Sequence, residues 1–350
     1  RASGLHPECR EFDPLTAHLK SFMFLHGAFF LSKKWSFKKI RNSFACPKSL
    51  GLFFAVITIF IWGITFVSTK YLLNKFSPLE ILFVRFILAY AGLCIIKPVP
   101  LKLKNKKDNL WFFLAGLSGI IIYQFTENAA ISFTTASNVS IIVSICPMFT
   151  AIIAQIFLKE KHITLFFVVG FIIAISGIVL VSLNGSSGMH FNPKGDLLAL
   201  ASAVCWGFYS LFVSKINAME IDKILCTRRT FFFAVISMIP FVVFGILEKN
   251  PSSSFHIGIE PSVNAERFSS ILNWMNFCFL GLGASAFCFV VWNVACNTLG
   301  TVKVTVGLYM IPVVTIIFAF FILGERMTAM GLAGCILTIA GLAISNRRKK

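Results

Sequence analysis

The sequence has few charged residues, and this shortage excludes several classes of protein. Only 13% of its 350 residues are Asp, Glu, Lys or Arg, whereas 57% are hydrophobic. An ordinary soluble domain carries about 25% charged residues, so this chain could not cover a surface that faces water. A soluble enzyme, a disordered protein and a fibrous protein are therefore excluded. The 40 Phe and 23 Gly are typical of a polytopic membrane protein.

Motifs for ATP, metal and redox chemistry are also lacking. The sequence contains no GxxxxGK[ST] motif that would bind ATP phosphates. Its six His and ten Cys form no HExxH, HxxxH or CxxC cluster, which zinc and redox sites need. We therefore expect no enzyme activity, no cofactor and no metal, and we interpret the Cys as small packing residues.

Long apolar runs dominate what is present. A bilayer core of about 30 Å needs about 20 apolar residues of helix, because backbone groups in lipid must bond within their own segment. Ten segments meet this requirement, and we predict ten transmembrane helices at about 50–73, 78–97, 110–130, 134–158, 163–183, 196–216, 226–247, 271–294, 300–323 and 329–346.

The basic residues orient these segments. The net charge is +18, but its Lys and Arg lie in short stretches between apolar runs, so we interpret them as topology determinants and expect no nucleic acid. With the N-terminus in the cytoplasm, the cytoplasmic segments hold 22 Lys and Arg and the outer loops hold five. This bias follows the positive-inside rule and predicts that both termini are cytoplasmic.

The chain repeats itself at a spacing of 165 residues. Nine of the 33 positions from 128 to 160 are identical to those 165 residues later, including Pro147 with Pro312 and Glu160 with Glu325. The chain therefore reads as two five-helix halves. Because five is odd, the second half enters the membrane from the opposite side, which predicts inverted repeats of the kind found in secondary transporters.

Several motifs, in the same order in both halves, resemble the EamA family of the drug/metabolite transporter superfamily over about residues 50–346. They are the string Trp62–Lys70, Arg85, Glu127-Asn128-Ala-Ala, Thr135–Ser140, Pro147 with Leu158-Lys-Glu160-Lys161, Gly195-Asp196 with Trp206, and Pro312 with Leu323-Gly-Glu325-Arg326. The resemblance implies a permease that exports or imports small metabolites, often amino acids, across the cytoplasmic membrane. We expect four regions: an N-terminal cytoplasmic segment whose numbered start need not be native, two EamA repeats and a basic cytoplasmic tail, at 1–49, 50–183, 196–346 and 347–350.

Two charged residues lie inside predicted spans and are candidates for the site. A carboxylate in lipid is costly and usually faces a cavity or a partner. Glu127 is therefore our candidate for proton coupling or for binding a substrate amine, and the alternative is a carboxylate at the helix end that reaches the interface. Arg85 is a candidate to pair with Glu127 or to bind an anionic substrate group, with a structural ion pair or snorkelling as the alternative.

Other polar and aromatic residues are candidates to line a substrate cavity. Interface belts and interhelical hydrogen bonds are the alternatives for them. Pro147 and Pro312 are candidate hinges, because proline removes an intrahelical hydrogen bond, although membrane helices also tolerate proline without such a role. The candidate lining residues are Gln124, Asn128, Asn138, Asn293, Trp62, Trp206, Trp292, Tyr123, Tyr209 and Tyr309.

These inferences predict an all-α polytopic membrane protein that works as a secondary active transporter by alternating access. The alternatives are a nucleotide-sugar or sugar-phosphate carrier of the same superfamily, which would need several basic residues in the cavity, and a non-transporting membrane subunit. The expected partners are a small-molecule substrate and the lipid bilayer, with a proton as the candidate coupling ion and a homodimer as one candidate assembly.

Overall fold

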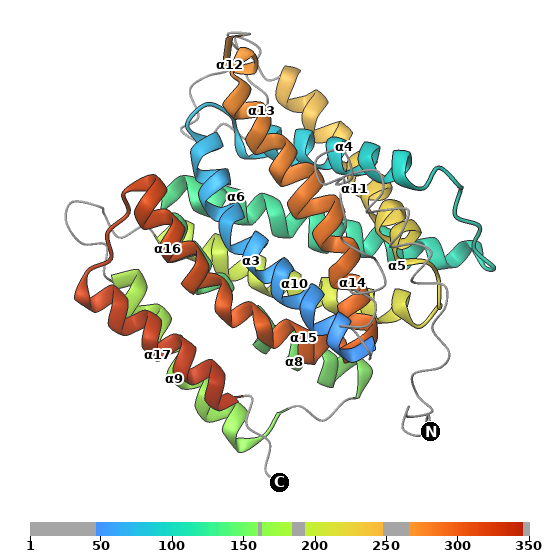
Figure 1. The fold of residues 1–350 in the computed structure, drawn as a ribbon. Helices are drawn as coiled ribbons and strands as arrows, with labels where there is room; N and C mark the ends of the chain where they lie inside the picture. Colours follow the sequence, from blue (N-terminus) through green and yellow to red (C-terminus); the bar gives the residue numbers. More distant parts are fainter. Residues whose placement is uncertain (1–46, 160–162, 184–192, 248–265, 346–350) are drawn as a thin grey trace, which may run out of the picture.

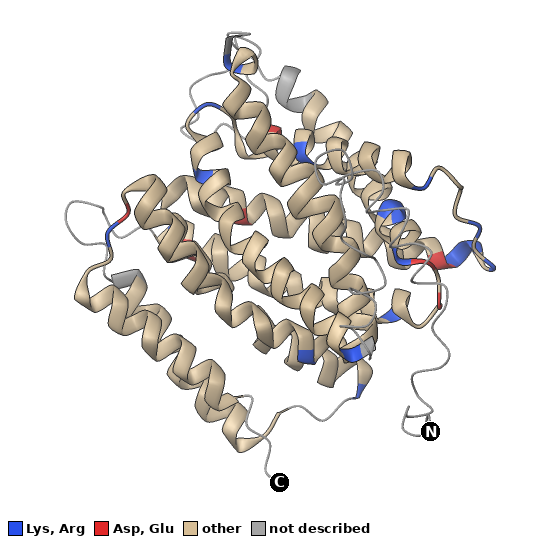
Figure 2. Ribbon diagram, in the orientation of Figure 1, with Lys and Arg blue, Asp and Glu red and all other residues tan. Residues whose placement is uncertain are grey.

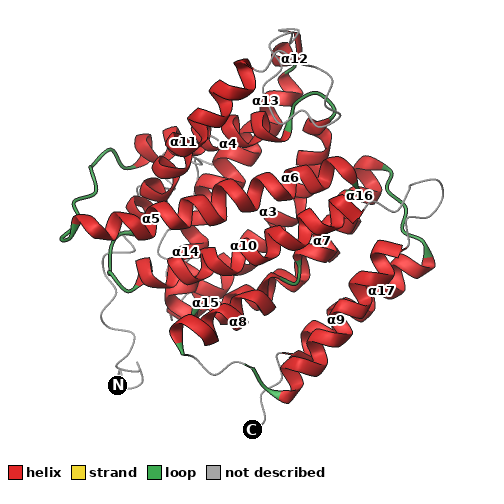
Figure 3. Ribbon diagram, turned by 180° about the vertical axis from the view of Figure 1, so that it is seen from behind, coloured by secondary structure: helices red, strands yellow, loops and turns green. Residues whose placement is uncertain are grey.

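The computed structural model describes residues 47–159, 163–183, 193–247 and 266–345, and these ranges contain helices and connecting loops but no strand (Figures 1 and 3). The all-helical prediction is thereby confirmed for the described part of the chain. The N-terminal segment before residue 47, the tail after residue 345 and Glu160 lie outside it.

Eight helical spans in the described ranges are long and apolar enough to cross a membrane, and two further apolar helices are shorter. Together they coincide with the ten predicted segments, and the number of membrane crossings stays a prediction. The eight spans are α3 (Pro47–Leu73), α4 (Pro78–Ile96), α5–η3–α6 (Asn109–Phe133, preceded by η2, Lys106–Asp108), α7–α8 (Ala136–Leu158), α10 (Pro193–Asn217), α11 (Lys223–Leu247), α13–η4–α14 (Ile271–Leu299, preceded by α12, Glu266–Ser269) and α15–η5–α16 (Thr301–Leu323). The two shorter helices are α9 (Leu165–Leu183) and α17 (Ala329–Ser345).

Local sequence explains where several helices begin and end. At the start of α4, the Glu80 backbone N–H donates to Ser77 Oγ (3.2 Å) and the Ser77 N–H donates to Glu80 Oε2 (2.8 Å), which is a capping box followed by Pro78. Helices α8 and α16 each end in the left-handed conformation, at Lys159 (φ 56°) and Gly324 (φ 68°). This conformation breaks the helix and lets the chain turn back.

Four spans are interrupted, and the interruptions fall at matched places in the two halves. A π-helical stretch separates α5 from α6 (η3) and α13 from α14 (η4), and the spans α7–α8 and α15–η5–α16 break before Pro147 and Pro312. Each proline is the second residue of α8 or α16, where the backbone N–H groups have no intrahelical partner. The prolines thus lie inside their spans, but at the start of a helix rather than in its middle. The segments are η3 (Gly116–Ile122), η4 (Phe279–Phe287), α8 (Cys146–Leu158), η5 (Val306–Met310) and α16 (Ile311–Leu323).

Helices α9 and α17 form a pair set apart from the other helices, as both views show (Figures 1 and 3). Glycines let their backbones approach closely: a Cβ added at Gly170 or Gly341 would lie 2.4 Å from a backbone atom of the partner helix, and one at Gly177 would lie 2.5 Å from the Thr338 nitrogen. Small residues are the usual means by which membrane helices pack closely, so this pair joins one helix of each half.

Charged side chains mark the two ends of the bundle, and Figure 2 shows them gathered mainly in loops and near helix ends. We name these ends after Glu80, in the first turn of α4, and Lys97, which follows its last residue. At the Glu80 end, Arg267 forms an ion pair with Glu80 (Nη2–Oε1, 2.5 Å), and at the Lys97 end Lys97 pairs with Asp222 (2.8 Å). Each pair joins α4 to a segment of the second half.

Candidate functional site

A small cavity of about 20 Å³ lies among helices of both halves. Most of its wall comes from α3, α4, α6 and the break between α7 and α8, while α10, η5 and α16 close the other side. All of its acidic, basic and amide side chains belong to the first half. The lining residues are Trp62, Thr65, Phe66, Arg85, Tyr123, Gln124, Glu127, Val143, Ser144, Trp206, Leu308 and Ile311.

Arg85 is fixed inside this wall by two side chains. It is 1% exposed, its Nε donates to Ser285 Oγ (2.6 Å), and its Nη1 donates to Gln124 Oε1 (2.8 Å). The guanidinium also lies over the Phe86 ring, with its Cζ 5.5 Å from the ring centre. Hydrogen bonds to charged groups are stronger than neutral ones, so Arg85 is held as a rigid cationic group at the junction of α4, α6 and η4.

Glu127 lies one turn after Gln124 on α6 (Tyr123–Phe133) and is 3% exposed. Its Oε2 has no hydrogen-bond partner among the described residues. The Tyr123 hydroxyl is a hydrogen-bonding neighbour of the carboxylate. Arg85 attracts it as an opposite charge, but the guanidinium donates to Gln124 rather than directly to Glu127. Glu127 thus retains an acceptor oxygen that no described donor uses.

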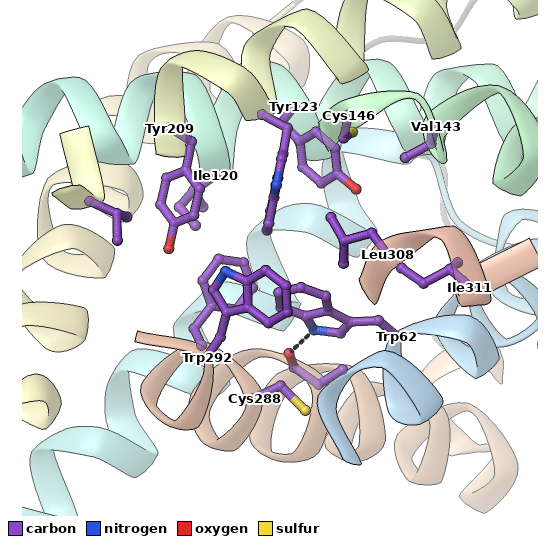
Figure 4. Close-up of a cluster of buried hydrophobic side chains, with 14 of the residues drawn as sticks. Trp62, Ile120, Tyr123, Val143, Cys146, Tyr209, Cys288, Trp292, Leu308 and Ile311 are labelled. Carbon is purple, nitrogen blue, oxygen red and sulfur yellow. Dashed lines mark hydrogen bonds between the residues drawn. The ribbon is translucent and has the colours of Figure 1, made fainter. Parts of the chain in front are cut away.

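Aromatic rings that meet edge to face or at a tilt form another part of the site (Figure 4). The ring centres of Trp62 and Trp206 are 5.3 Å apart at 88°, and those of Trp62 and Trp292 are 4.9 Å apart. Tyr123 lies 5.0 Å from Trp206. The Trp62 indole Nε1 donates to the Ala284 carbonyl at 2.9 Å, which is the dashed line in Figure 4. Edge-to-face contacts of this kind stabilise aromatic clusters, so they make this side of the cavity rigid.

The structure brings together, around the cavity, half of the residues that the sequence suggested for it. Glu127, Gln124, Arg85, Trp62 and Trp206 all line the cavity, and Tyr123 does so as well. The Glu127 side chain is buried in the wall, not placed at the interface as the alternative had it. The predicted ion pair between Arg85 and Glu127 is replaced by the bond from Arg85 to Gln124.

Six other candidates lie outside the lining, among them Trp292, whose ring packs against Trp62. Asn128 Nδ2 donates to the Pro78 carbonyl (3.3 Å), Asn293 Nδ2 donates to Thr227 Oγ1 (3.0 Å), and Asn138 Nδ2 donates to Thr134 Oγ1 (3.3 Å). These three amides join helices or brace a helix start. Tyr209 and Tyr309 are buried, and the Tyr209 ring packs against Trp206 at 5.0 Å. They support the site from behind the lining.

Some lining residues were not among the candidates predicted from the sequence. Thr65 and Phe66 follow Trp62 by one helical turn, so the 3.6-residue period of α3 could have identified them. Val143, Ser144, Leu308 and Ile311 lie at the two breaks that precede Pro147 and Pro312. The matched prolines were a usable signal for them, because a break in a span exposes the residues beside it to a cavity.

Within the described ranges, no three His, Cys, Asp or Glu side chains gather into a group that could hold a metal ion. The polar part of the cavity consists instead of one carboxylate, one guanidinium, one amide and hydroxyl groups.

Comparison with known proteins assigns the family. The sequence model of the EamA-like transporter family matches residues 49–183 and, a second time, residues 193–347. The chain belongs to the EamA-like transporter family. The family prediction is therefore confirmed, and the chain is a multi-pass membrane protein of a family of transporters.

Named relatives of this EamA-family chain are transporters, at low identity. An uncharacterized transporter of Archaeoglobus fulgidus is 26% identical over 298 residues, which is 84% of this chain and 96% of the relative. A probable terminal-alkyne amino-acid exporter of Streptantibioticus cattleyicolor is 25% identical, covering 84% of this chain and 92% of the relative. A probable amino-acid metabolite efflux pump of Salmonella typhimurium is also 25% identical, over 84% and 93%.

A solved crystal structure shares the fold. It superposes with a TM-score of 0.58 at 17% identity and covers 85% of this chain and 98% of that chain. The similarity covers most of this chain and supports its fold alone.

Proposed function

We propose that this EamA-family protein is a secondary active transporter of small organic metabolites, namely amino acids or related solutes, and that substrate binds in the cavity beside Glu127 and Arg85. The observation that carries the proposal is this pair of buried, opposite charges on one wall of a cavity bounded by both halves. Ionisable residues inside a membrane protein usually mark a substrate or ion pathway. A carboxylate and a guanidinium in one small cavity suit a zwitterion, whose ammonium and carboxylate groups they complement.

Alternating access between two inverted five-helix repeats is the mechanism that we propose for it. In support, the π-helical stretches η3 and η4 and the breaks before Pro147 and Pro312 recur at matched places in the two halves. We assign the repeats to residues 50–183 and 196–346, with α9 and α17 as their fifth helices, which makes ten crossings. Substrate at the interface of such repeats can then be exposed to one side at a time.

We propose that Pro147 and Pro312 act as hinges at the two helix breaks. The cavity residues Ser144 and Ile311 lie within three residues of Pro147 and Pro312. A change of angle at either break would move α7 against α8, or η5 against α16, and would therefore change the shape of the cavity directly. Hinge residues at the ends of helices commonly absorb such changes.

The cytoplasmic membrane is the location that we propose, with both termini in the cytoplasm. The Lys97 end of the bundle would then face the cytoplasm and the Glu80 end would face outward. The uneven distribution of Lys and Arg supports this orientation. A proton is the coupling ion that we propose, with Glu127 as its carrier, because a buried carboxylate with a free acceptor oxygen can take up a proton when substrate leaves.

The composition of the cavity wall favours an amino-acid-like substrate over a nucleotide sugar or a sugar phosphate. Phosphate recognition relies on clusters of Arg or Lys, and Arg85 is the only basic residue in the lining of this cavity. Lys70, a second basic residue on a helix that lines the cavity, donates instead to the Ile131 and Thr134 carbonyls, both at 2.7 Å.

Thermal unfolding of the purified protein with a panel of ligands tests this proposal. The panel contains amino acids, amines, sugars, nucleotides and drugs. We expect amino acids to raise the melting temperature in a dose-dependent manner, because a ligand at 100 times its Kd adds about 2.7 kcal/mol to the free energy of unfolding. Stabilisation by nucleotides or sugar phosphates alone would contradict the proposal, as would a folded protein that none of the compounds stabilises.

A further inference from the structure

Two tryptophans occupy matched positions in the two halves, each followed by glycine: Trp62 on α3 and Trp206 on α10. Both line the cavity. They are 7% and 2% exposed, and their rings meet edge to face. By residue type, burial and position the two are alike.

Their indole N–H groups differ. Trp62 Nε1 donates to the Ala284 carbonyl (Figure 4), whereas Trp206 Nε1 is buried and has no acceptor among the described residues. Buried N–H groups nearly always have an acceptor, because leaving one unpaired carries a desolvation cost. A buried indole N–H without an acceptor is therefore unusual and needs a physical explanation.

An unpaired group of the opposite kind lies in the same cavity. Glu127 Oε2 is an acceptor without a donor, and Trp206 Nε1 is a donor without an acceptor. Both side chains line the cavity, and Tyr123 contacts both, since its ring lies 5.0 Å from Trp206 and its hydroxyl neighbours Glu127. A single ligand that carries a donor and an acceptor could satisfy the two groups together.

We propose that Trp206 determines specificity by donating its indole N–H to an acceptor oxygen of the substrate's carboxylate, while the matched Trp62 uses its own N–H to hold η4. This inference rests on the proposed function and narrows it. The ligand is a compound with an ammonium group for Glu127 and a carboxylate oxygen for Trp206. Sites built to hydrogen-bond a substrate group discriminate strongly against analogues that lack that group, because their own polar atoms are then left unpaired.

The test compares acids with their decarboxylated amines in Trp206→Phe. The probes are L-leucine with isoamylamine and L-phenylalanine with phenethylamine, and binding is measured by melting temperature against concentration. For the unchanged protein we expect each acid to bind more tightly than its amine. Trp206→Phe should weaken binding of the acids by roughly 10- to 100-fold, the range for a hydrogen bond to a charged group, and leave the amines nearly unchanged.

Trp62→Phe is the matched control, and the ratio of acid to amine affinity is the discriminating measurement. Trp62→Phe should lower the melting temperature of the free protein, because it removes the hydrogen bond to Ala284. It should change acid and amine binding by the same factor. If Trp206→Phe does not fold, the isosteric residue 3-benzothienylalanine at position 206 keeps the shape of the indole and removes only its N–H.

The outcomes separate the two proposals. A Trp206→Phe protein, or its isosteric variant, that keeps the acid-to-amine ratio overturns the role of Trp206 and leaves the transporter proposal intact. If the unchanged protein binds neither member of either pair while another class of compound stabilises it, both proposals are wrong.

Discussion

The two halves of the chain use matched positions for different chemistry. Helix α6 of the first half faces the cavity with three polar side chains, whereas α14 in the second half carries apolar or aromatic residues at the positions 165 residues later. The matched pairs are Tyr123 with Cys288, Gln124 with Phe289 and Glu127 with Trp292. Pro147 and Pro312, which are alike, shape the fold, and the charged groups of the proposed site come from positions that differ.

The largest effect should follow from removing the charge that only the first half possesses. Glu127→Gln should reduce transport driven by a pH gradient by about 100-fold, because a charged hydrogen bond contributes roughly 1.5–3 kcal/mol and the amide cannot carry the coupling proton. Flux into liposomes with and without the gradient measures this. Glu220→Gln makes the same chemical change at an exposed loop position and should leave flux unaltered. Gradient-driven flux that survives Glu127→Gln would remove Glu127 as the coupling residue.

Two further substitutions test the contact between α9 and α17, where the two halves use matched glycines. Gly177→Leu on α9 and Gly341→Leu on α17 each place a side chain where even a Cβ would lie within 2.6 Å of a backbone atom of the other helix. Both should lower the free energy of unfolding by about 1–3 kcal/mol or more, and by similar amounts. Gly283→Ala is the control, since its Cβ meets only Phe279 Cδ2, at 3.8 Å. A large effect from one glycine and none from the other would show that the pair is not symmetric.

One helix start is joined to the other half by a charged cap, which can be tested. The Glu325 carboxylate of the second half accepts hydrogen bonds from the Ala136 N–H (2.9 Å), the Ser137 N–H (3.1 Å) and Ser137 Oγ (2.6 Å) at the start of α7. At the start of α15, Ser214 Oγ donates to Thr301 Oγ1 at 3.0 Å, and Glu160, which matches Glu325, lies outside the described residues. The Glu80 end is therefore joined across the halves by a charged helix cap.

Loss of that cap should have a moderate cost. Glu325→Gln should lower the free energy of unfolding by about 0.5–2 kcal/mol, the usual range for a capping residue, and denaturant unfolding followed by Trp fluorescence would report it. Arg326→Gln neutralises the neighbouring, exposed residue and serves as control. Equal stability of the Glu325 variant and the parent would mean that α7 does not depend on the cap.

The smallest effect should come from a residue that the halves share. Asn128 and Asn293 each make one side-chain hydrogen bond and each leave a buried Oδ1 without a partner. Leucine at either position removes the hydrogen bond and the unpaired oxygen together. The lost hydrogen bond and the relieved cost of burying an unpaired oxygen nearly cancel, so we expect changes in the free energy of unfolding within about 1 kcal/mol. Neither residue lines the cavity, so substrate affinity should stay constant. Weakened binding in Asn128→Leu would show that the site extends beyond the cavity described above.

The architecture could be predicted from the sequence because lipid imposes length and hydropathy on each helix. The ten predicted segments coincide with the eight spans and two shorter helices, and the 165-residue spacing anticipated the paired breaks. Glu127 and Arg85 were identifiable because charge is rare within the spans. Asn138, Tyr209 and Tyr309 lie outside the observed lining, and the sequence could not show this, since a helix that is apolar on every side gives no signal for its rotation about its own axis.

Flux of labelled neutral amino acids by the purified protein in liposomes tests the central claim most directly. The account predicts saturable uptake that a pH gradient drives, that excess unlabelled amino acid suppresses, and that Glu127→Gln reduces by about 100-fold. A folded protein that carries no amino acid across the membrane under any gradient would contradict it.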